Sequence, residues 1–287
     1  MKYAAAFLLC FLTLPVSAAE IGFKGGFTSP DDLGAVYYGA EVSETIDIPN
    51  NHKLKLSADY KMTDFSDAAG FMPDTLTQAA LGIDITGPEY LFNLKAGVST
   101  DEPFEESDGY FAGIMAAKNV YESGPHKFYL GLVASNKELL DDMYILPAFG
   151  YSYTAPNLYI LAGSLNMIKW KPAEKVSFEA SLSVLGQGKV KGTYHWSRDF
   201  RTSLVYSNDT DTYYLGRDYP EDSELKIRIA SVSLEAEKDI YEYAKLVLSA
   251  GMITSARYYI LDDDDEVLRD KKISGGATGS AELRIMF

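Results

Sequence analysis

Ala281-Glu282-Leu283-Arg284-Ile285-Met286-Phe287 is the stretch that decides the fold, and it closes the printed sequence. Successive side chains of a β-strand point to opposite faces, so Leu283, Ile285 and Phe287 share one face, and Glu282 and Arg284 share the other. One face of the predicted strand is therefore apolar and the other is charged. Both a soluble edge strand and a strand that faces lipid fit this pattern, so the rest of the chain must distinguish them.

The same period of two recurs along the chain. Alternating apolar and polar residues cover 53–62, 78–85, 92–99 and 176–184. A period of two with one apolar face predicts half-buried strands. A soluble β-sandwich also alternates, but segments of about ten residues have the length that a tilted strand needs to cross a bilayer.

The first nineteen residues have the layout of a secretory signal peptide. Lys2 precedes an apolar run over 4–14, and the small residues Ser17, Ala18 and Ala19 follow. We expect cleavage after Ala19 or one residue earlier. The chain's single cysteine, Cys10, lies in the apolar run without the small residue that a lipoprotein signal places before it. The predicted organisation is a signal peptide over 1–19 and one domain over 20–287, with neither disulfide nor thiol chemistry in the exported part.

The chain's ending resembles the C-terminal assembly signal of bacterial outer-membrane β-barrels, which implies that Leu283, Ile285 and Phe287 act in assembly. Composition agrees, because 21 Tyr and 23 Gly suit a barrel with aromatic girdles. Short turns, such as the one at Gly87-Pro88, alternate with longer acidic stretches, such as 207–223. We therefore predict an all-β, closed antiparallel transmembrane β-barrel in the outer membrane of a Gram-negative bacterium. The predicted count is about 14 strands within a range of 12 to 16, because the segments at 21–28, 157–164 and 166–171 are short.

A second resemblance covers about the C-terminal half. The segment 144–153 contains Leu146-Pro147-Ala148-Phe149-Gly150, a short apolar strand follows at 158–163, and 168–172 ends in Trp170-Lys171-Pro172. This arrangement resembles an uncharacterised bacterial family of outer-membrane β-barrels with a Leu-Pro-x-x-Gly strand, a short strand and an aromatic-x-Pro turn. The family's usual proline after the short strand is replaced around Leu165. The resemblance implies a fold and a location, and no catalytic residues.

The polar faces of the strands predict the lining of the lumen. A charged side chain on the lipid face is costly near the bilayer midplane, so charges on alternating strands are expected to point inward. The predicted lumen-lining residues are Lys55, Lys95, Glu179, Lys191, Arg228 and Arg284. Such a mixed set either pairs into a salt-bridged plug or lines a polar pore, and the sequence leaves both open.

The sequence holds little that indicates catalysis. Of its three histidines, His195 could pair with Ser197 or Ser203 as a base and a nucleophile, yet adjacent polar residues are the rule inside a barrel. There is no His-x-x-x-His pair, clustered Cys and His, or Gly-rich phosphate loop. We predict no enzyme, no cofactor and no metal site. The acidic run 262–266 is expected to be a solvated loop tip, with divalent-cation binding or contact with a receptor or partner as the alternatives.

Three functions remain open. The first is a passive, porin-like channel for small polar solutes. The second is a non-conducting structural or adhesive surface barrel, and the third is a lipid-modifying hydrolase. The formal net charge of −15 argues against the attraction of nucleic acid or anionic lipid as the main role of the chain. The expected partners are outer-membrane lipid, lipopolysaccharide and the barrel-assembly machinery, and the sequence does not indicate the oligomeric state.

Overall fold

The computed structural model describes residues 19–287 except 30–32, 67–71, 103–108, 137–143, 184–186, 217–218, 221–222, 263–265 and 274. The predicted signal peptide thus lies outside the described residues, apart from Ala19. Every regular element in the described part is a strand. The described residues contain no helix that is long and apolar enough to cross a membrane. The strands are β1 Ala19–Ser29, β2 Gly34–Ile48, β3 His52–Ser66, β4 Thr75–Thr86, β5 Tyr90–Thr100, β6 Tyr110–Ser123, β7 His126–Ser135, β8 Ile145–Ala155, β9 Leu158–Gly163, β10 Leu165–Ala173, β11 Val176–Ser183, β12 Gly188–His195, β13 Phe200–Tyr214, β14 Glu224–Tyr241, β15 Ala244–Leu261, β16 Val267–Ile273 and β17 Ala277–Met286.

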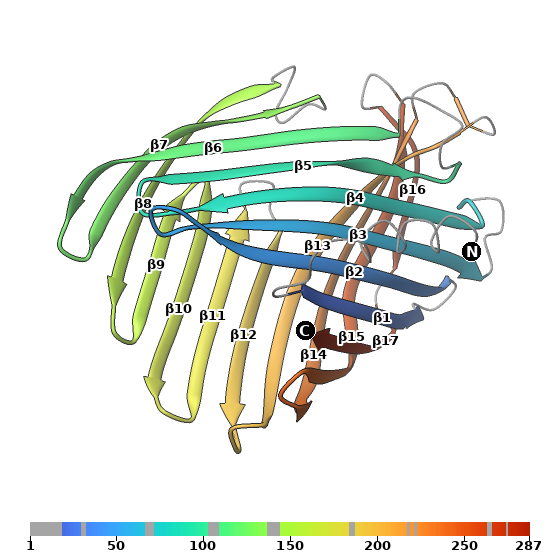
Figure 1. The fold of residues 1–287 in the computed structure, drawn as a ribbon. Helices are drawn as coiled ribbons and strands as arrows, with labels where there is room; N and C mark the ends of the chain where they lie inside the picture. Colours follow the sequence, from blue (N-terminus) through green and yellow to red (C-terminus); the bar gives the residue numbers. More distant parts are fainter. Residues whose placement is uncertain are drawn as a thin grey trace.

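The sheet closes on itself. Each strand from β1 to β15 pairs antiparallel with the next along the chain, and β17 returns to pair with β1, where Ile285 registers with Ile21 (Figure 1). β16 pairs with residues 256–261 of β15, at the end of the barrel that carries the longer connections, which we call the loop end. β17 pairs with residues 244–252 of β15, toward the end with the short turns, the turn end. β16 and β17 therefore form one wall strand that is interrupted at Gly275 and Gly276. Both glycines have positive φ, of 95° and 139°, which favours glycine over other residues. The wall therefore has 16 strands.

The predicted all-β, closed antiparallel barrel is confirmed, but the preferred count of about 14 strands is wrong. The error came from the short segments, which are the strands β1, β9 and β10. β9 has six residues, yet it pairs with β8 on one side and with β10 on the other. A closed barrel must satisfy the backbone groups of every wall strand in this way, so a short strand still counts.

The outer surface is apolar and carries aromatic residues at both ends. Near the turns, the exposed aromatic residues are Tyr90, Tyr121, Phe128, Trp170, Phe178, Tyr194, Trp196, Tyr241, Tyr243 and Phe287. Toward the loops, Phe27, Tyr38 and Tyr110 are exposed on the same outer face. Between these ends the exposed outer residues are mostly Leu, Val and Ile, with Phe23, Phe149 and Tyr206 among them. An apolar band with aromatic residues at both borders is what a surface in contact with lipid requires.

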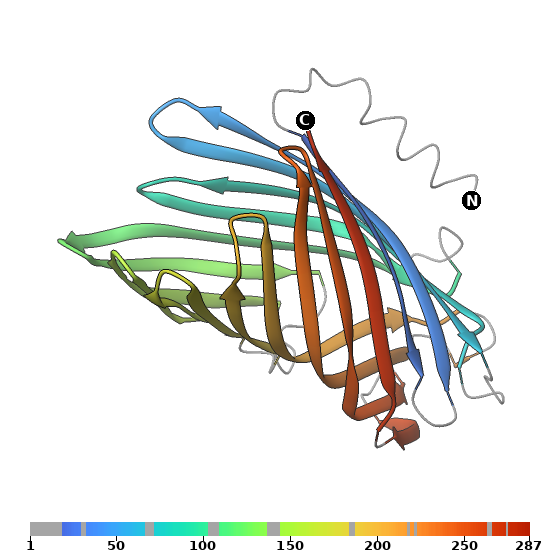
Figure 2. The same ribbon diagram turned by 90° about the horizontal axis from the view of Figure 1, so that it is seen from below.

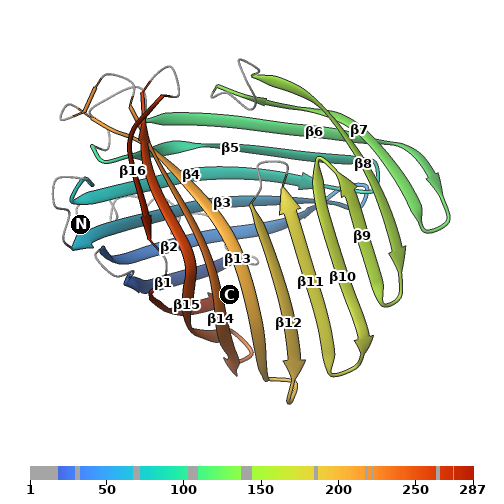
Figure 3. The same cartoon turned by 180° about the vertical axis from the view of Figure 1, so that it is seen from behind.

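The barrel narrows toward the loops. The half formed by β1–β7 and the half formed by β9–β15 spread apart at the turns and come together at the loop ends (Figures 1 and 3). The view from below shows the same taper (Figure 2). The main hydrophobic cluster lies at the narrow end and consists of Leu33, Met72, Leu76, Tyr213, Leu215, Leu225, Ile227, Ile253, Ala256, Tyr258, Ile260 and Ile273. We call this cluster the loop-end plug.

A bulge in β15 places part of the plug. Ser231 of β14 registers with Ile253, but the adjacent Ala230 registers with Ser255, so β15 has one extra residue, Thr254. An extra residue shifts the alternation of the strand beyond it. Ile253 therefore faces inward before the bulge, and Ala256 and Tyr258 face inward after it, all within the plug.

Candidate functional site: the lumen

The ends of two strands from opposite walls touch at the loop end of the lumen. Thr100 of β5 and Tyr214 of β13 form a parallel bridge, although their strands are far apart around the barrel. The Ser99 hydroxyl donates to the Thr212 carbonyl at 2.6 Å, and the Asp101 carboxylate accepts the Gly216 N–H at 2.8 Å. Burial raises the pKa of Asp101 above its ordinary value of 3.8. These bonds fasten the two walls together above the plug.

An ion pair crosses the lumen just below this contact. Lys61 of β3 and Asp211 of β13 lie 2.7 Å apart, Nζ to Oδ2, and each side chain is less than 40% exposed. Because β3 and β13 belong to opposite walls, the pair joins the walls and not two neighbouring strands. A partly buried pair is screened less by salt than a surface pair. The loop end of the lumen is thus held shut by apolar packing, backbone contacts and one charge pair.

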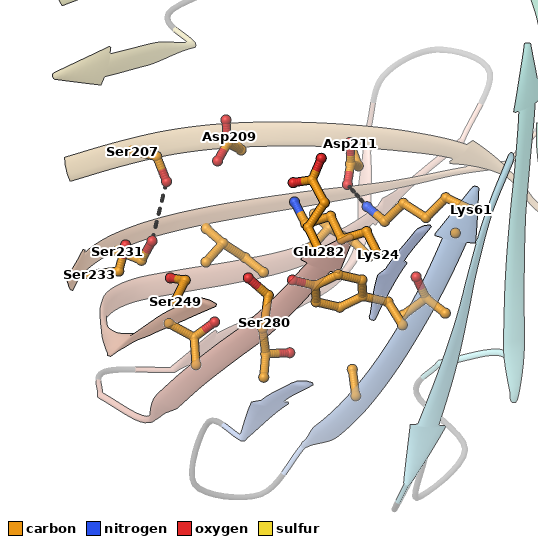
Figure 4. A pocket seen from close by; sticks show the side chains of 18 of the residues that line it. Lys24, Lys61, Ser207, Asp209, Asp211, Ser231, Ser233, Ser249, Ser280 and Glu282 are labelled. Carbon is orange, nitrogen blue, oxygen red and sulfur yellow. Dashed lines mark hydrogen bonds and ion pairs between the residues drawn. The ribbon is translucent and has the colours of Figure 1, made fainter. Parts of the chain in front are cut away.

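Below the plug lies a polar cavity of about 640 Å³. Figure 4 shows its hydroxyl-rich wall, where Ser207, Ser231, Ser233, Ser249 and Ser280 project into the space from β13, β14, β15 and β17. Ser207 and Ser231 are hydrogen-bonded at 3.2 Å. The charged lining residues are Lys24, Glu41, Asp59, Lys61, Lys189, Asp209, Asp211, Glu235 and Glu282. A cavity of this composition suits water and small polar solutes and offers no apolar binding pocket.

The wall of the lumen nearer the turns carries paired charges. Lys191 and Glu235 lie 2.6 Å apart, Nζ to Oε2, across the intervening β13. Glu237 accepts from both Arg201 and Lys245, and the Lys245 Nζ–Oε1 distance is 2.9 Å. Arg284 contacts Glu282 on its own strand, and its Nη1 lies 3.5 Å from Glu20 Oε1 on β1. Positive and negative side chains are therefore paired with each other along the inner wall near the turns.

Five of the six residues predicted to line the lumen lie on its inner face. Lys95 pairs with the cavity residue Asp59 at 3.1 Å, and Lys55 lies four residues from Asp59 on the same face of β3. Lys191 and Arg284 make the inward pairs described above, and Glu179 registers with Lys191. Their placement agrees with the alternation, whereas their role in solute passage is a separate question.

Arg228 lies on the outer face, which corrects the prediction for this residue. Its neighbours Ile227 and Ile229 line the cavity, so Arg228 shares the outward face of β14 with Val232 and Leu234. The side chain is exposed. The prediction assumed that every charge on a strand points inward, but β14 has 18 residues. A strand of that length extends beyond the bilayer, where an outward charge is not penalised.

The histidine candidate for catalysis lacks a catalytic arrangement. His195 Nε2 lies 3.2 Å from Ser177 Oγ, which was not one of the expected partners. Ser197 donates to Asp199 in the turn, and Ser203 is bonded to Thr193. In the described part of the chain no carboxylate is bonded to His195, so no group is seen to orient it as a base. The described residues also contain no cluster of three or more metal-ligating side chains, and most of the acidic run 262–266 lies outside them.

The sequence prediction missed the features that close and shape the lumen. Lys24 and Lys61 lie on predicted strands, and alternation could have assigned their faces. Asp211 lies in the acidic stretch 207–223, which was expected to be a connection, but its first residues belong to β13. The contact between Lys61 and Asp211 could not be predicted, because 150 residues separate them. The contact also requires the two opposite walls of the barrel to approach each other at the loop end. The plug was missed because inward apolar residues such as Ile227 and Tyr258 look like lipid-facing ones in an alternating pattern.

Comparison with known proteins gives distant structural likenesses. No family model and no curated protein sequence matches the chain. Among solved structures, Pseudomonas aeruginosa OccK5 (OpdH) is 9% identical, with a TM-score of 0.38, 96% of this chain covered and 99% of that one. The NanC porin is 8% identical, with a TM-score of 0.34 and coverages of 92% and 98%. Vibrio cholerae OmpT is 9% identical, with a TM-score of 0.36 and coverages of 94% and 96%. At these values the likeness adds nothing to what the chain's own strand pairing shows.

Proposed function

We propose that the chain is a bacterial outer-membrane β-barrel that acts as a porin-like channel for small polar solutes. The observation that carries this proposal is the polar, charge-lined cavity of about 640 Å³ inside a closed barrel whose outer face is apolar. Such a wall satisfies its backbone groups internally and presents apolar side chains to lipid. The short turns would face the periplasm, and the longer connections would face outward.

The path through the barrel is interrupted by the loop-end plug. A solute that enters from the turn side reaches the cavity and meets the plug, where Ile227, Tyr258 and Leu76 are each less than 10% exposed. Passage therefore requires the wall of β3–β5 to separate from the wall of β13–β15. The Lys61–Asp211 pair and the β5–β13 bridge would open in the same movement. An apolar constriction of this kind gates by excluding water.

The closed loop end also favours a second candidate, a non-conducting structural or surface barrel. Planar-bilayer recordings distinguish the two. The channel proposal expects conductance steps separated by closed periods, and it expects Ile229→Ser to lengthen the open periods, since Ile229 lines the cavity and packs against the plug. Met252→Ser is the matched control, because Met252 is 62% exposed on the outer face. Folded barrels that stay silent with and without Ile229→Ser would overturn the channel proposal in favour of the second candidate.

The assembly role of Leu283, Ile285 and Phe287 and the expected partners belong to the same proposal. The three side chains lie on one face of the closing strand, and the Phe287 N–H donates to the Ala19 carbonyl at 2.9 Å. Phe287 is 65% exposed, so its ring contributes little packing to the folded barrel. An exposed terminal ring is available to the barrel-assembly machinery, and the apolar outer face to lipid and lipopolysaccharide.

A further inference from the structure

Three cations stand in one row across the outer face of three wall strands. Arg228 of β14 registers directly with Arg257 of β15, and Arg257 registers directly with Lys272 of β16. All three point outward, because the adjacent residues Ile227, Tyr258 and Ile273 point into the plug. The row exists because of the bulge at Thr254, which shifts the alternation of β15 and brings Arg257 to the outer face.

The row carries more positive charge than its surroundings neutralise. Like charges that are directly opposite on neighbouring strands destabilise a sheet. Asp270 binds the Arg257 guanidinium with two bonds, of 3.0 and 2.9 Å. Within the described part of the chain, neither Arg228 nor Lys272 makes an ion pair. These three clustered cations share one carboxylate, that of Asp270, among the described residues, and this local excess of positive charge indicates that an anion completes the site.

The height of the row identifies where that anion would come from. Arg228 and Lys238 both lie on the outer face of β14, ten residues apart, and the outward residues between them are Ala230, Val232, Leu234 and Ala236. Ten residues span about 33 Å along a strand and roughly 25 Å along the axis of a barrel with a typical tilt. That distance is about the height of the apolar band of an outer-membrane barrel. The row thus lies at the boundary of the outer leaflet, where lipid phosphates are.

We propose that Arg228, Arg257 and Lys272 bind a phosphate group of an anionic lipid in the outer leaflet. This rests on the membrane location given under the proposed function, and it does not require conduction. Asp270 takes the Nε and Nη2 donors of Arg257, which leaves Nη1 for the phosphate. Arg228 and Lys272, on the strands to either side, supply the other donors. Guanidinium groups suit phosphate because they offer parallel N–H donors. The lipid's acyl chains would lie on the exposed outer face below, which includes Met252 and Leu248.

Native mass spectrometry of the folded barrel in detergent tests the site without depending on conductance. The probes are a short-chain phosphatidic acid, the matched diacylglycerol without phosphate, and inorganic phosphate alone. We expect the phosphatidic acid to bind and Arg228→Gln/Lys272→Gln to weaken it at least about tenfold. Arg228→Lys/Lys272→Arg should retain most of the binding. Lys238→Gln is the matched control, because Lys238 is an outward cation at the opposite boundary and pairs with Asp199.

Three results would overturn the proposal. Equal binding of the diacylglycerol would show that the phosphate is not recognised, and equal binding of inorganic phosphate would show that the lipid is not the source. An unchanged affinity in Arg228→Gln/Lys272→Gln, with a barrel that still shifts in mobility on heating, would place the lipid elsewhere. None of these results bears on whether the barrel conducts, so this proposal and the channel proposal can fail separately.

Discussion

Leu234→Arg should destabilise the barrel strongly, whereas Ser233→Arg, one residue away, should not. Leu234 is 65% exposed and registers with the outward residues Leu204 and Ala250. It also lies near the middle of the apolar run of β14. Ser233 lines the polar cavity. An arginine that faces lipid near the midplane costs about 2–4 kcal/mol, which corresponds to a roughly 30- to 700-fold loss in the folding equilibrium constant.

Equilibrium unfolding in phospholipid vesicles measures this difference. The two tryptophans, Trp170 and Trp196, are exposed on the outer face near the turns. Their fluorescence therefore reports whether the barrel is inserted. With an unchanged denaturant slope, the free energy of unfolding of Leu234→Arg should fall by the stated amount, and that of Ser233→Arg by less than about 1 kcal/mol. Equal losses in the two variants, or none in Leu234→Arg, would refute the assignment of the two faces of β14 to lipid and lumen.

Three further predictions concern selectivity, pH and assembly. Lys95→Glu leaves Asp59 beside a second carboxylate, so the reversal potential in a salt gradient should shift toward cation selectivity, and an unchanged potential would show that ions do not pass this wall. Burial raises the pKa of Asp101, so protonation favours the closed loop end, and this stabilisation is lost as pH rises through the raised pKa. Closed periods in bilayer recordings should therefore lengthen on acidification in the wild type and in the control Glu102→Gln, but not in Asp101→Asn. The same pH response in Asp101→Asn would exclude protonation of Asp101 as the cause. Deleting Phe287 should lower the amount of inserted protein in cells while the inserted barrels keep nearly normal unfolding midpoints, and wild-type amounts would contradict an assembly role.

Alternation made the closed barrel and the faces of most strands predictable. The face on which Lys95 or Glu179 lies depends only on the alternation of its own strand. On most strands the apolar side chains face outward and the polar side chains face the lumen. The number of strands was less predictable, because β9 has six residues and a strand that short does not show from the sequence whether it is a separate wall strand. Its pairing with β8 and β10 becomes evident with the neighbouring strands in place.

The closure of the lumen depends on information that no local pattern holds. Ile227 and Tyr258 alternate like lipid-facing residues, but they are cross-strand neighbours that point inward, and Leu76 of the opposite wall joins them in the plug. Arg228 shows the converse, because alternation gives a face but not a height relative to the bilayer. The extra residue Thr254 changes which residues of β15 point outward, and such a bulge has no clear signal in the sequence.

The loop-end closure is tested most directly by a cross-link across the lumen. Cys10 is the chain's single cysteine and lies in the predicted signal peptide, so Lys61→Cys/Asp211→Cys would provide the two thiols of the exported barrel. The native side chains meet at 2.7 Å, Nζ to Oδ2, so a short bifunctional thiol reagent should join the two cysteines efficiently. Single-channel conductance of this variant is then recorded before and after complete cross-linking. We predict conductance steps before cross-linking and their loss afterwards; steps of unchanged size after complete cross-linking would contradict closure of the lumen at this point.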